Sequence, residues 1–247
     1  MPSGLFETMR ISRGRIPLLD RHLKRLCGGW IALGFSPLPP KDELRAAAVQ
    51  RVSESNIEEG VLRLIATGGE GKSAAWEFRV QEGIAYTSEH YSQGVGAALV
   101  PAQRDESSKL CRYKTLDYFG DYLARRQARE RGVFEGLLQN SRGFLAEGSV
   151  SNLFVVKNGC VKTPPLEDGA LPGIARSLVV EKIVEWGWDY AKESLLLSDV
   201  LDADEAFLTN AVMGVMPLVQ LEGQRIGNGA PGVKTKEQME CYSSLLF

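Results

Sequence analysis

The chain has 247 residues, of which 44% are hydrophobic and 24% are charged, and its formal net charge is −2. That length is sufficient to bury a core in one large domain or in two modest ones. Lys and Arg are spread along the chain without a basic stripe, which argues against nucleic-acid binding. No apolar run has the length of a membrane span, and charges interrupt the N-terminus where a signal peptide needs its apolar core.

The cysteines give no sign of a metal site or of disulfide bonds. They are Cys27, Cys111, Cys160 and Cys241. Because they lie far apart and show no paired spacing, neither a zinc site nor a disulfide framework is predicted. We therefore expect no bound metal and a reduced, cytoplasmic enzyme.

The first part of the chain, residues 1–95, predicts a small N-terminal α/β domain. Residues 4–11 alternate in part and predict a strand. A helix follows, with apolar residues at helical spacing until Gly34, and a second helix begins after the prolines that end at residue 40. Strands are expected at 61–66 and 76–80, and the glycine-rich turn between them is typical of a hairpin.

The second part of the chain, residues 109–247, predicts a larger C-terminal domain. Residues 96–108 are irregular and partly polar, which indicates a linker between the two domains. An amphipathic helix is expected from Leu116 to Gly132, where glycine ends it. Short strands are expected after it at 135–139, 151–156, 205–209 and 215–221. One long helix is expected at 174–186.

The residues best suited to chemistry are Lys114 and Glu147. Glu147 lies on a Gly-Ser turn within residues 145–157, which read Leu-Ala-Glu-Gly-Ser-Val-Ser-Asn-Leu-Phe-Val-Val-Lys. Taken alone, a lysine near a helix start is nearly always a solvated surface charge, and Glu-Gly-Ser turns are common in loops. The functional interpretation is favoured because the lysine and the specific Glu-Gly-x-x-Ser-Asn-Leu-Phe pattern occur together.

This combination resembles the cofactor site of the fold-type IV pyridoxal-phosphate enzymes, which include branched-chain and D-amino acid aminotransferases and aminodeoxychorismate lyase. The resemblance implies that Lys114 carries pyridoxal 5'-phosphate as a Schiff base and that Glu147 pairs with the pyridine nitrogen, which strengthens the ring as an electron sink. It assigns Ser151 and Asn152 to cofactor binding as well. It also implies an α+β fold of two domains, a small α/β N-terminal domain and a larger C-terminal α/β pseudo-barrel.

One expected phosphate site is the helix that begins after Pro172-Gly173. The free N–H groups of a first helical turn, aided by the helix dipole, form an anion site. By resemblance to the Gly-Ile-Thr-Arg type of segment in the family, Ile174 and Ala175 contact the phosphate. The plainer alternative is an ordinary helix start.

Two other segments complete the phosphate site that the resemblance implies. After the strand at 205–209, Asn210 and Ala211 are expected to contact the phosphate largely through the backbone. A His-x-x-Arg-Leu motif at residues 22–26 makes Arg25 the cationic ligand. Alone, His22 and Arg25 are more commonly a surface pair one helical turn apart.

Within the class, the sequence is most like aminodeoxychorismate lyase, because of Phe6-Glu7-Thr8 and of the run from Asn210 to Pro217. Such a lyase releases 4-aminobenzoate and pyruvate from 4-amino-4-deoxychorismate in folate synthesis. The alternative is a class IV aminotransferase acting on branched-chain or D-amino acids. Retention of both Lys114 and Glu147 argues against a third possibility, a non-catalytic relative.

The lyase interpretation implies a small-molecule substrate, a homodimer and functional coupling to an aminodeoxychorismate synthase. Some lyases carry an Arg-Gly pair where this chain has Thr67-Gly68. Arg63 and Lys72 are therefore both candidates for the missing positive charge.

Overall fold

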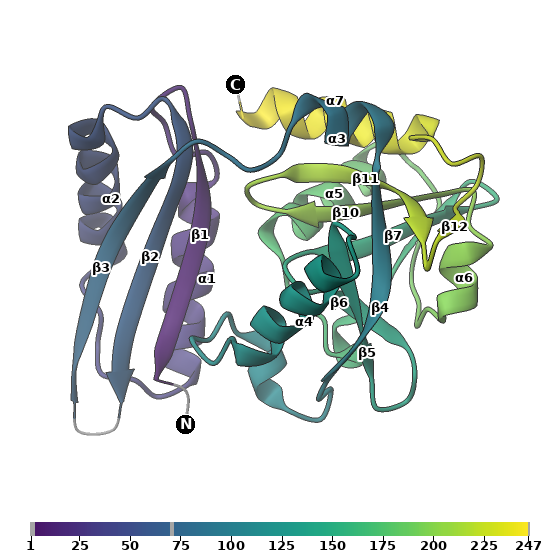
Figure 1. Cartoon of the computed structure of the whole chain (residues 1–247). Helices are drawn as coiled ribbons and strands as arrows, with labels where there is room; N and C mark the ends of the chain where they lie inside the picture. The colour runs from purple at the N-terminus through teal and green to yellow at the C-terminus, as the bar shows by residue number, and fades with distance from the viewer. Residues whose placement is uncertain (1–2, 70–71, 247) are drawn as a thin grey trace. The chain divides into compact units, whose positions relative to one another are not determined.

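The computed structural model describes residues 3–69 and 72–246, and the chain divides into two compact units (Figure 1). The first unit comprises the described residues up to Ala85, with Tyr113–Asp117 and the C-terminal residues from Leu245. The second unit comprises Tyr86–Arg112 and Tyr118–Ser244. No helix in the described part of the chain is long and apolar enough to cross a membrane.

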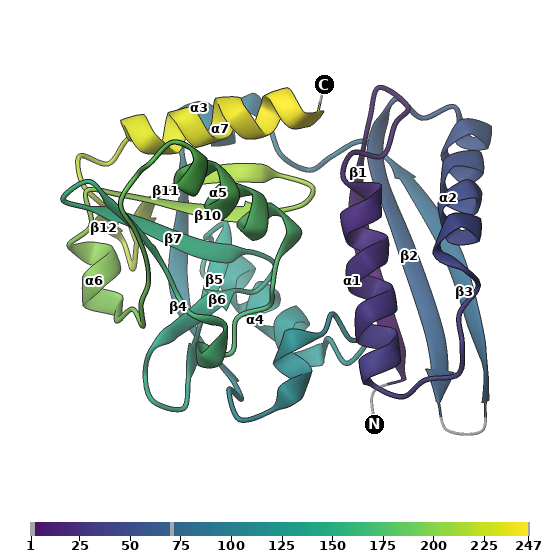
Figure 2. The ribbon, with the colours of Figure 1, turned by 180° about the vertical axis from the view of Figure 1, so that it is seen from behind.

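The first unit is a three-stranded antiparallel sheet with two helices on one face (Figure 2). Its elements are β1 (Gly4–Ser12), α1 (Leu19–Ala32), α2 (Lys41–Ser55), β2 (Glu59–Gly69) and β3 (Lys72–Glu82). The apolar stripe of α1, with Leu23, Leu26 and Trp30 at helical spacing, is buried. It packs with alternate residues of β1 and β2 in a single core, so the predicted small α/β architecture is confirmed.

The second unit is built on a curled sheet in the strand order β6-β5-β4-β11-β10-β7-β8-β9, with β12 paired to β11. Its strands are β4 (Val95–Arg104), β5 (Glu135–Asn140), β6 (Leu145–Gly148), β7 (Asn152–Lys157), β8 (Cys160–Thr163), β9 (Tyr190–Lys192), β10 (Glu205–Asn210), β11 (Gly214–Leu221) and β12 (Gln224–Arg225). Apolar side chains of β4, β5, β7, β10 and β11 meet in one core. This curled sheet is the expected α/β pseudo-barrel, so the predicted α+β fold class is confirmed.

The helices of the second unit are arranged around this sheet. They are α3 (Ser88–Gln93), α4 (Phe119–Glu130), α5 (Ile174–Glu185), α6 (Leu197–Leu201) and α7 (Val233–Leu246), with short 3-10 turns η1 (Lys109–Arg112) and η2 (Leu166–Asp168). Helix α4 packs on β4 and β5, and α5 packs on β10. The long helix predicted at 174–186 begins at the same residue as α5 and ends one residue after it.

The expected linker at residues 96–108 differs from what the structure shows. Most of it is strand β4, an interior strand paired in parallel with both β5 and β11. Ala97, Ala98 and Val100 are buried, because the strand is covered on both faces. A strand covered in this way shows no alternation of polar and apolar residues, which is why its sequence seemed irregular.

The helix expected from Leu116 begins later, at Phe119. The preceding residues, Tyr113–Asp117, belong to the first unit, where they lie along the edge of β1. Their backbone groups are used in hydrogen bonds to β1, so they are not available for a helical turn. Because the helix begins only at Phe119, the candidate lysine Lys114 is held by pairing with β1.

Candidate active site

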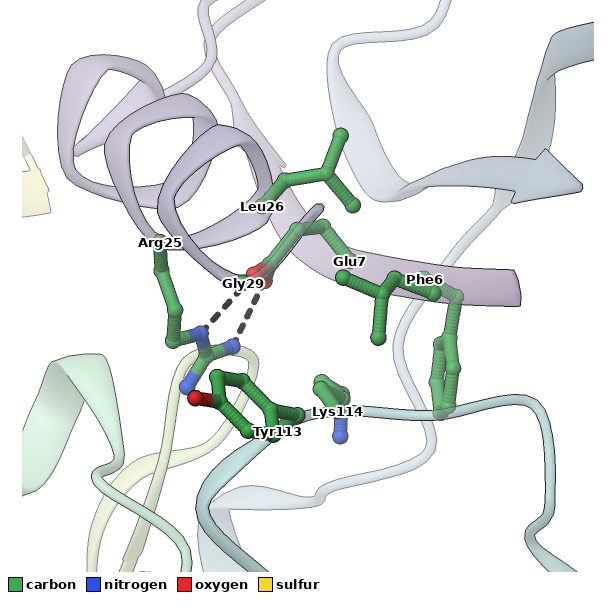
Figure 3. A pocket seen from close by; sticks show the side chains of 8 residues that line it. Phe6, Glu7, Arg25, Leu26, Gly29, Tyr113 and Lys114 are labelled. Carbon is green, nitrogen blue, oxygen red and sulfur yellow. Dashed lines mark hydrogen bonds and ion pairs between the residues drawn. The ribbon is translucent and has the colours of Figure 1, made fainter. Parts of the chain in front are cut away.

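A small pocket in the first unit opens beside Lys114 (Figure 3). It is lined by Leu5, Phe6, Glu7, Arg25, Leu26, Gly29, Tyr113 and Lys114. The Lys114 Nζ lies 4.5 Å from the centroid of the Phe6 ring, a distance at which a cation and an aromatic face attract each other. The structure thus brings together Lys114 and Arg25, which the sequence predicted as parts of one cofactor site.

The backbone of Lys114 is fixed by strand pairing. The Phe6 N–H donates to the Lys114 carbonyl at 2.9 Å, and the Leu116 N–H donates to the Gly4 carbonyl at 3.0 Å. Glycine is required at position 4, since a Cβ there would lie 2.0 Å from the Ala66 carbonyl oxygen. The lysine is therefore carried by an extended segment on a sheet edge, and not by the helix start that the sequence suggested.

Arg25 reaches the pocket from α1 and is bound by Glu7 of β1. Its Nε donates to Glu7 Oε1 at 2.8 Å and its Nη2 donates to Glu7 Oε2 at 2.6 Å, a bidentate pair (Figure 3). His22 Nδ1 lies 2.7 Å from the same Oε2. His22 and Arg25 are thus not a solvated surface pair, because both converge on one buried carboxylate.

Glu7 is 1% exposed, and its ionisation is controlled by these two partners. Burial alone would raise the pKa of Glu7. The charge of Arg25 and the hydrogen bonds from His22 and Arg25 outweigh it and lower the pKa from 4.5 to about 2. Glu7 is therefore an anion across the physiological pH range, and its bidentate pair orients the guanidinium of Arg25.

In the second unit, Glu147 of β6 is buried and held from two sides. Its Oε2 accepts hydrogen bonds from Asn152 Nδ2 at 3.1 Å and from the Leu171 N–H at 3.0 Å. Its Oε1 lies 2.7 Å from Nη2 of Arg104. The structure therefore brings Glu147 and Asn152 together, and it adds Arg104, which sequence reasoning missed.

Ser151 lies beside a different carboxylate, Glu135 at the start of β5. The Ser151 hydroxyl donates to Glu135 Oε2 at 2.7 Å, and the Ser149 hydroxyl donates to Oε1 at 2.5 Å. Burial raises the pKa of Glu135, although these hydrogen bonds act in the opposite direction. Glu135 fixes the turn that joins β6 to β7. Its one sequence signal is a glutamate heading the buried strand Glu135–Asn140.

The N-terminus of α5 lies next to the Glu147 cluster. The N-cap residue is Gly173, and a Cβ at that position would lie 2.0 Å from Asn152 Oδ1. Only glycine permits this approach, which brings the first-turn residues Ile174 and Ala175 to the side chain that also binds Glu147. A buried carboxylate beside an open helix start fits the ring nitrogen and the phosphate of pyridoxal phosphate.

Asn210 closes the turn between β10 and β11. Its Oδ1 accepts from the N–H groups of Val212 at 2.9 Å and Met213 at 2.8 Å. The contact of Asn210 and Ala211 with a phosphate stays a prediction, as do those of Ser151, Ile174 and Ala175. Lys114 and Arg25 belong to the first unit, and the other residues predicted to bind the cofactor belong to the second.

Sequence comparison identifies the family. The chain belongs to the class IV aminotransferases, since the sequence model of that family matches residues 4–221. One relative is the putative branched-chain-amino-acid aminotransferase of Methanocaldococcus jannaschii, which is 29% identical over 98% of this chain and 86% of that protein.

Solved structures confirm the fold. The branched-chain amino acid aminotransferase of T.th., solved with pyridoxamine 5'-phosphate, superposes with a TM-score of 0.91 at 24% identity, over 98% of this chain and 84% of that one. A putative 4-amino-4-deoxychorismate lyase of Legionella pneumophila superposes with a TM-score of 0.90 at 23% identity, over 99% and 91%. The enzymes of this family depend on pyridoxal phosphate, so the predicted family and cofactor are both confirmed.

The ion pair of Glu7 makes the stability of the protein depend on pH between about 4.5 and about 2. The stabilisation by Glu7 is complete above its unfolded pKa near 4.5 and is lost as pH falls through about 2. We expect Glu7→Gln to lower the free energy of unfolding at pH 7 by about 3 kcal/mol. Urea denaturation of both proteins between pH 2 and pH 7 measures this difference, which should shrink as pH falls below 4.5.

The matched control is Glu59→Gln. Glu59 also pairs with an arginine, Arg10, but its side chain is 42% exposed. Solvent screens such a pair, so this variant should lose much less stability. A difference between wild type and Glu7→Gln that stayed constant from pH 7 to pH 2 would contradict the role given to Glu7.

Proposed function

We propose that this protein is a 4-amino-4-deoxychorismate lyase that uses pyridoxal phosphate to release 4-aminobenzoate and pyruvate. The observation that carries the proposal is a second cation against the aromatic ring that the candidate lysine contacts. Arg63 of β2 lies over the same Phe6 ring as Lys114, with its Cζ 5.7 Å from the ring centroid. Among the described residues, no carboxylate forms an ion pair with Arg63.

The register of the sheet makes an anionic ligand for Arg63 favourable. Arg79 of β3 lies directly opposite Arg63, and like charges at such positions destabilise a sheet. Arg79 is balanced by an ion pair with Glu77. The lyase substrate carries two carboxylates, so it needs cationic groups that an apolar amino acid does not. The other candidate, Lys72, has its side chain outside the described residues.

The proposed mechanism divides the chemistry among the residues of the site. Pyridoxal phosphate supplies a ring that draws electrons from the substrate carbon attached to it. Lys114 would hold the cofactor through its side-chain amine, and the freed amine would act as the general base that takes the proton from the amine-bearing carbon of the substrate. Loss of the enolpyruvyl group and formation of the aromatic product follow from that proton removal.

The remaining site residues hold and tune the cofactor. Glu147 would keep the ring nitrogen protonated, and Asn152 holds its carboxylate in place. Ser151 would contact the cofactor from the β6–β7 turn. Arg25 would donate charge-assisted hydrogen bonds to the phosphate, and Glu7 orients its guanidinium. Backbone groups of the α5 start and of the β10–β11 turn complete the phosphate site, at Ile174, Ala175, Asn210 and Ala211.

The alternative function is an aminotransferase that acts on branched-chain or D-amino acids. The Methanocaldococcus jannaschii relative favours it, and the first proton removal is the same. The two differ in what the pocket must accept. An aminotransferase binds an amino acid and a keto acid in turn, whereas the lyase binds one dianion and needs no second binding mode.

The wider setting of the enzyme follows from the same proposal. We infer a homodimer in the cytoplasm, acting on a small molecule beside a synthase that supplies the unstable substrate. Gel filtration with light scattering tests the dimer.

Covalent attachment tests the cofactor lysine. Borohydride reduction of the holoenzyme, followed by peptide mapping, should place the pyridoxyl mass on Lys114. Lys114→Ala should lose turnover and the absorbance of the bound cofactor while keeping its fold, because the amine contributes little to packing. Label on Lys109 or Lys157 instead would overturn the assignment.

Product analysis tests the reaction type. With a synthase generating 4-amino-4-deoxychorismate, we expect 4-aminobenzoate fluorescence and equimolar pyruvate, at a rate far above any transamination of branched-chain or D-amino acids. Absence of 4-aminobenzoate, with steady conversion of an amino donor and 2-oxoglutarate, would instead identify an aminotransferase and leave the cofactor residues in place.

Substitution of Arg63 tests the carboxylate site. Arg63→Gln removes one charge-assisted hydrogen bond, so KM for the lyase substrate should rise roughly tenfold to a hundredfold. Arg79→Gln is the matched control on the neighbouring strand, and it should change KM little because Glu77 already balances Arg79. Equal effects of the two substitutions would show a general field effect of the sheet and no specific contact.

A further inference from the structure

We propose that Arg104 is a positioning residue that keeps the Glu147 carboxylate ionised and oriented, and that it thereby sets the protonation of the cofactor ring. This inference rests on the proposed function, in which Glu147 faces the ring nitrogen. It assigns a role to a residue outside the motifs of the sequence. Both residues belong to the second unit.

Arg104 lies at the end of β4, where one guanidinium joins two carboxylates. Its Nη2 is 2.7 Å from Glu147 Oε1. The same group donates to Asp121 of α4, from Nη1 to Oδ2 at 3.3 Å and from Nη2 to Oδ1. The side chains of Arg104, Asp121 and Glu147 are 20%, 6% and 5% exposed, so water screens this cluster weakly.

The two carboxylates of this cluster depend on the positive charge of Arg104 to remain ionised. Burial would lower the pKa of Arg104, but the charges of Glu147 and Asp121 outweigh burial and raise it. Without the guanidinium, two buried carboxylates would face each other, and such a pair takes up a proton. A protonated Glu147 is neutral and no longer stabilises a protonated ring nitrogen.

The neutral groups around the cluster cannot replace that positive charge. Tyr118 and Cys111 are titratable groups near it, and burial raises the pKa of both, so both are neutral. Asn152 and the Leu171 N–H contact the other oxygen of Glu147, and both are neutral donors. They hold the carboxylate in place without supplying a charge.

A second arginine, Arg176 of α5, acts on Glu147 only at longer range. Its charge and that of Glu147 influence each other, and burial lowers the pKa of Arg176. Its Nη2 donates to the Pro164 carbonyl at 2.9 Å, and within the described residues it forms no ion pair with Glu147. Arg104, in contrast, is in direct contact with Glu147, so its charge acts on that carboxylate at short range.

Arg142 provides a matched control within the same unit. It also bridges two carboxylates, with Nη2 at Asp168 Oδ1 and Nε 3.6 Å from Glu106 Oε1. Neither carboxylate is Glu147. Arg142→Gln therefore removes a similar ion-pair cluster while leaving the Glu147 partners in place.

The test measures the ring directly and does not rely on turnover. The holoenzyme is reconstituted with pyridoxal phosphate labelled with ¹⁵N in the ring, and the ¹⁵N chemical shift is recorded at pH 7 together with the thermal midpoint. We expect the wild type and Arg142→Gln to show a protonated ring. In Arg104→Gln the protonated fraction should fall about tenfold or more, a change of about one pKa unit or more.

Two further variants separate charge from structure. Arg104→Lys keeps the charge without the planar fork, so it should retain a protonated ring in part. Arg104→Gln with Asp121→Asn removes the competing carboxylate, so it should restore part of the protonated signal that Arg104→Gln loses. These two variants also decide the matter if Arg104→Gln does not fold.

The outcomes distinguish this inference from the proposed function. A lower thermal midpoint with an unchanged ¹⁵N shift in the Arg104 variants would show a purely structural role and overturn the inference. If Glu147→Gln shifts the ¹⁵N signal and no Arg104 variant does, the inference alone fails. If Glu147→Gln leaves the signal unchanged, Glu147 does not face the ring, and the proposed function fails at that residue.

Discussion

The bidentate pair between Glu7 and Arg25 is the interaction on which the organisation of the first unit depends. A buried carboxylate is costly unless it is paired and hydrogen-bonded, and Glu7 satisfies this requirement with Arg25 and His22. The pair ties α1 to β1, the strand whose other edge carries the Lys114 segment. One interaction thus fixes both the arginine and the strand that lies beside the lysine.

The second unit applies the same physics with a different purpose. Glu135 and Glu147 are both buried carboxylates, but Glu135 accepts hydrogen bonds from the serines of one turn, whereas Glu147 also contacts a cation. Serine hydroxyls and N–H groups hold a carboxylate in place without adding a charge. A guanidinium adds the charge that keeps a buried carboxylate ionised. The first arrangement suits a structural anchor, and the second suits a group that must remain an anion beside a cofactor.

Much of the fold could be predicted because the spacing of apolar residues within a segment indicates whether that segment forms a helix or a strand. Helix α5 and the hairpin β2–β3 follow from their own residues, and so does the position of Glu147 on a tight turn. Strand β4 could not be predicted, because its identity depends on partners β5 and β11 that are distant in sequence. The extended backbone of Lys114 was missed for the same reason, since β1 imposes it from more than a hundred residues away.

The candidate site shows the same division between local and distant information. Arg25, Lys114 and Glu147 stand in motifs, so a resemblance could find them. Glu7 and Arg104 act through partners on other elements, and nothing in the neighbouring sequence marks Arg104 as the cation of Glu147. A buried acid in a motif nevertheless requires a cation or a set of donors from somewhere in the fold. Searching for that partner is therefore a physical route from a recognised residue to the unrecognised one that controls it.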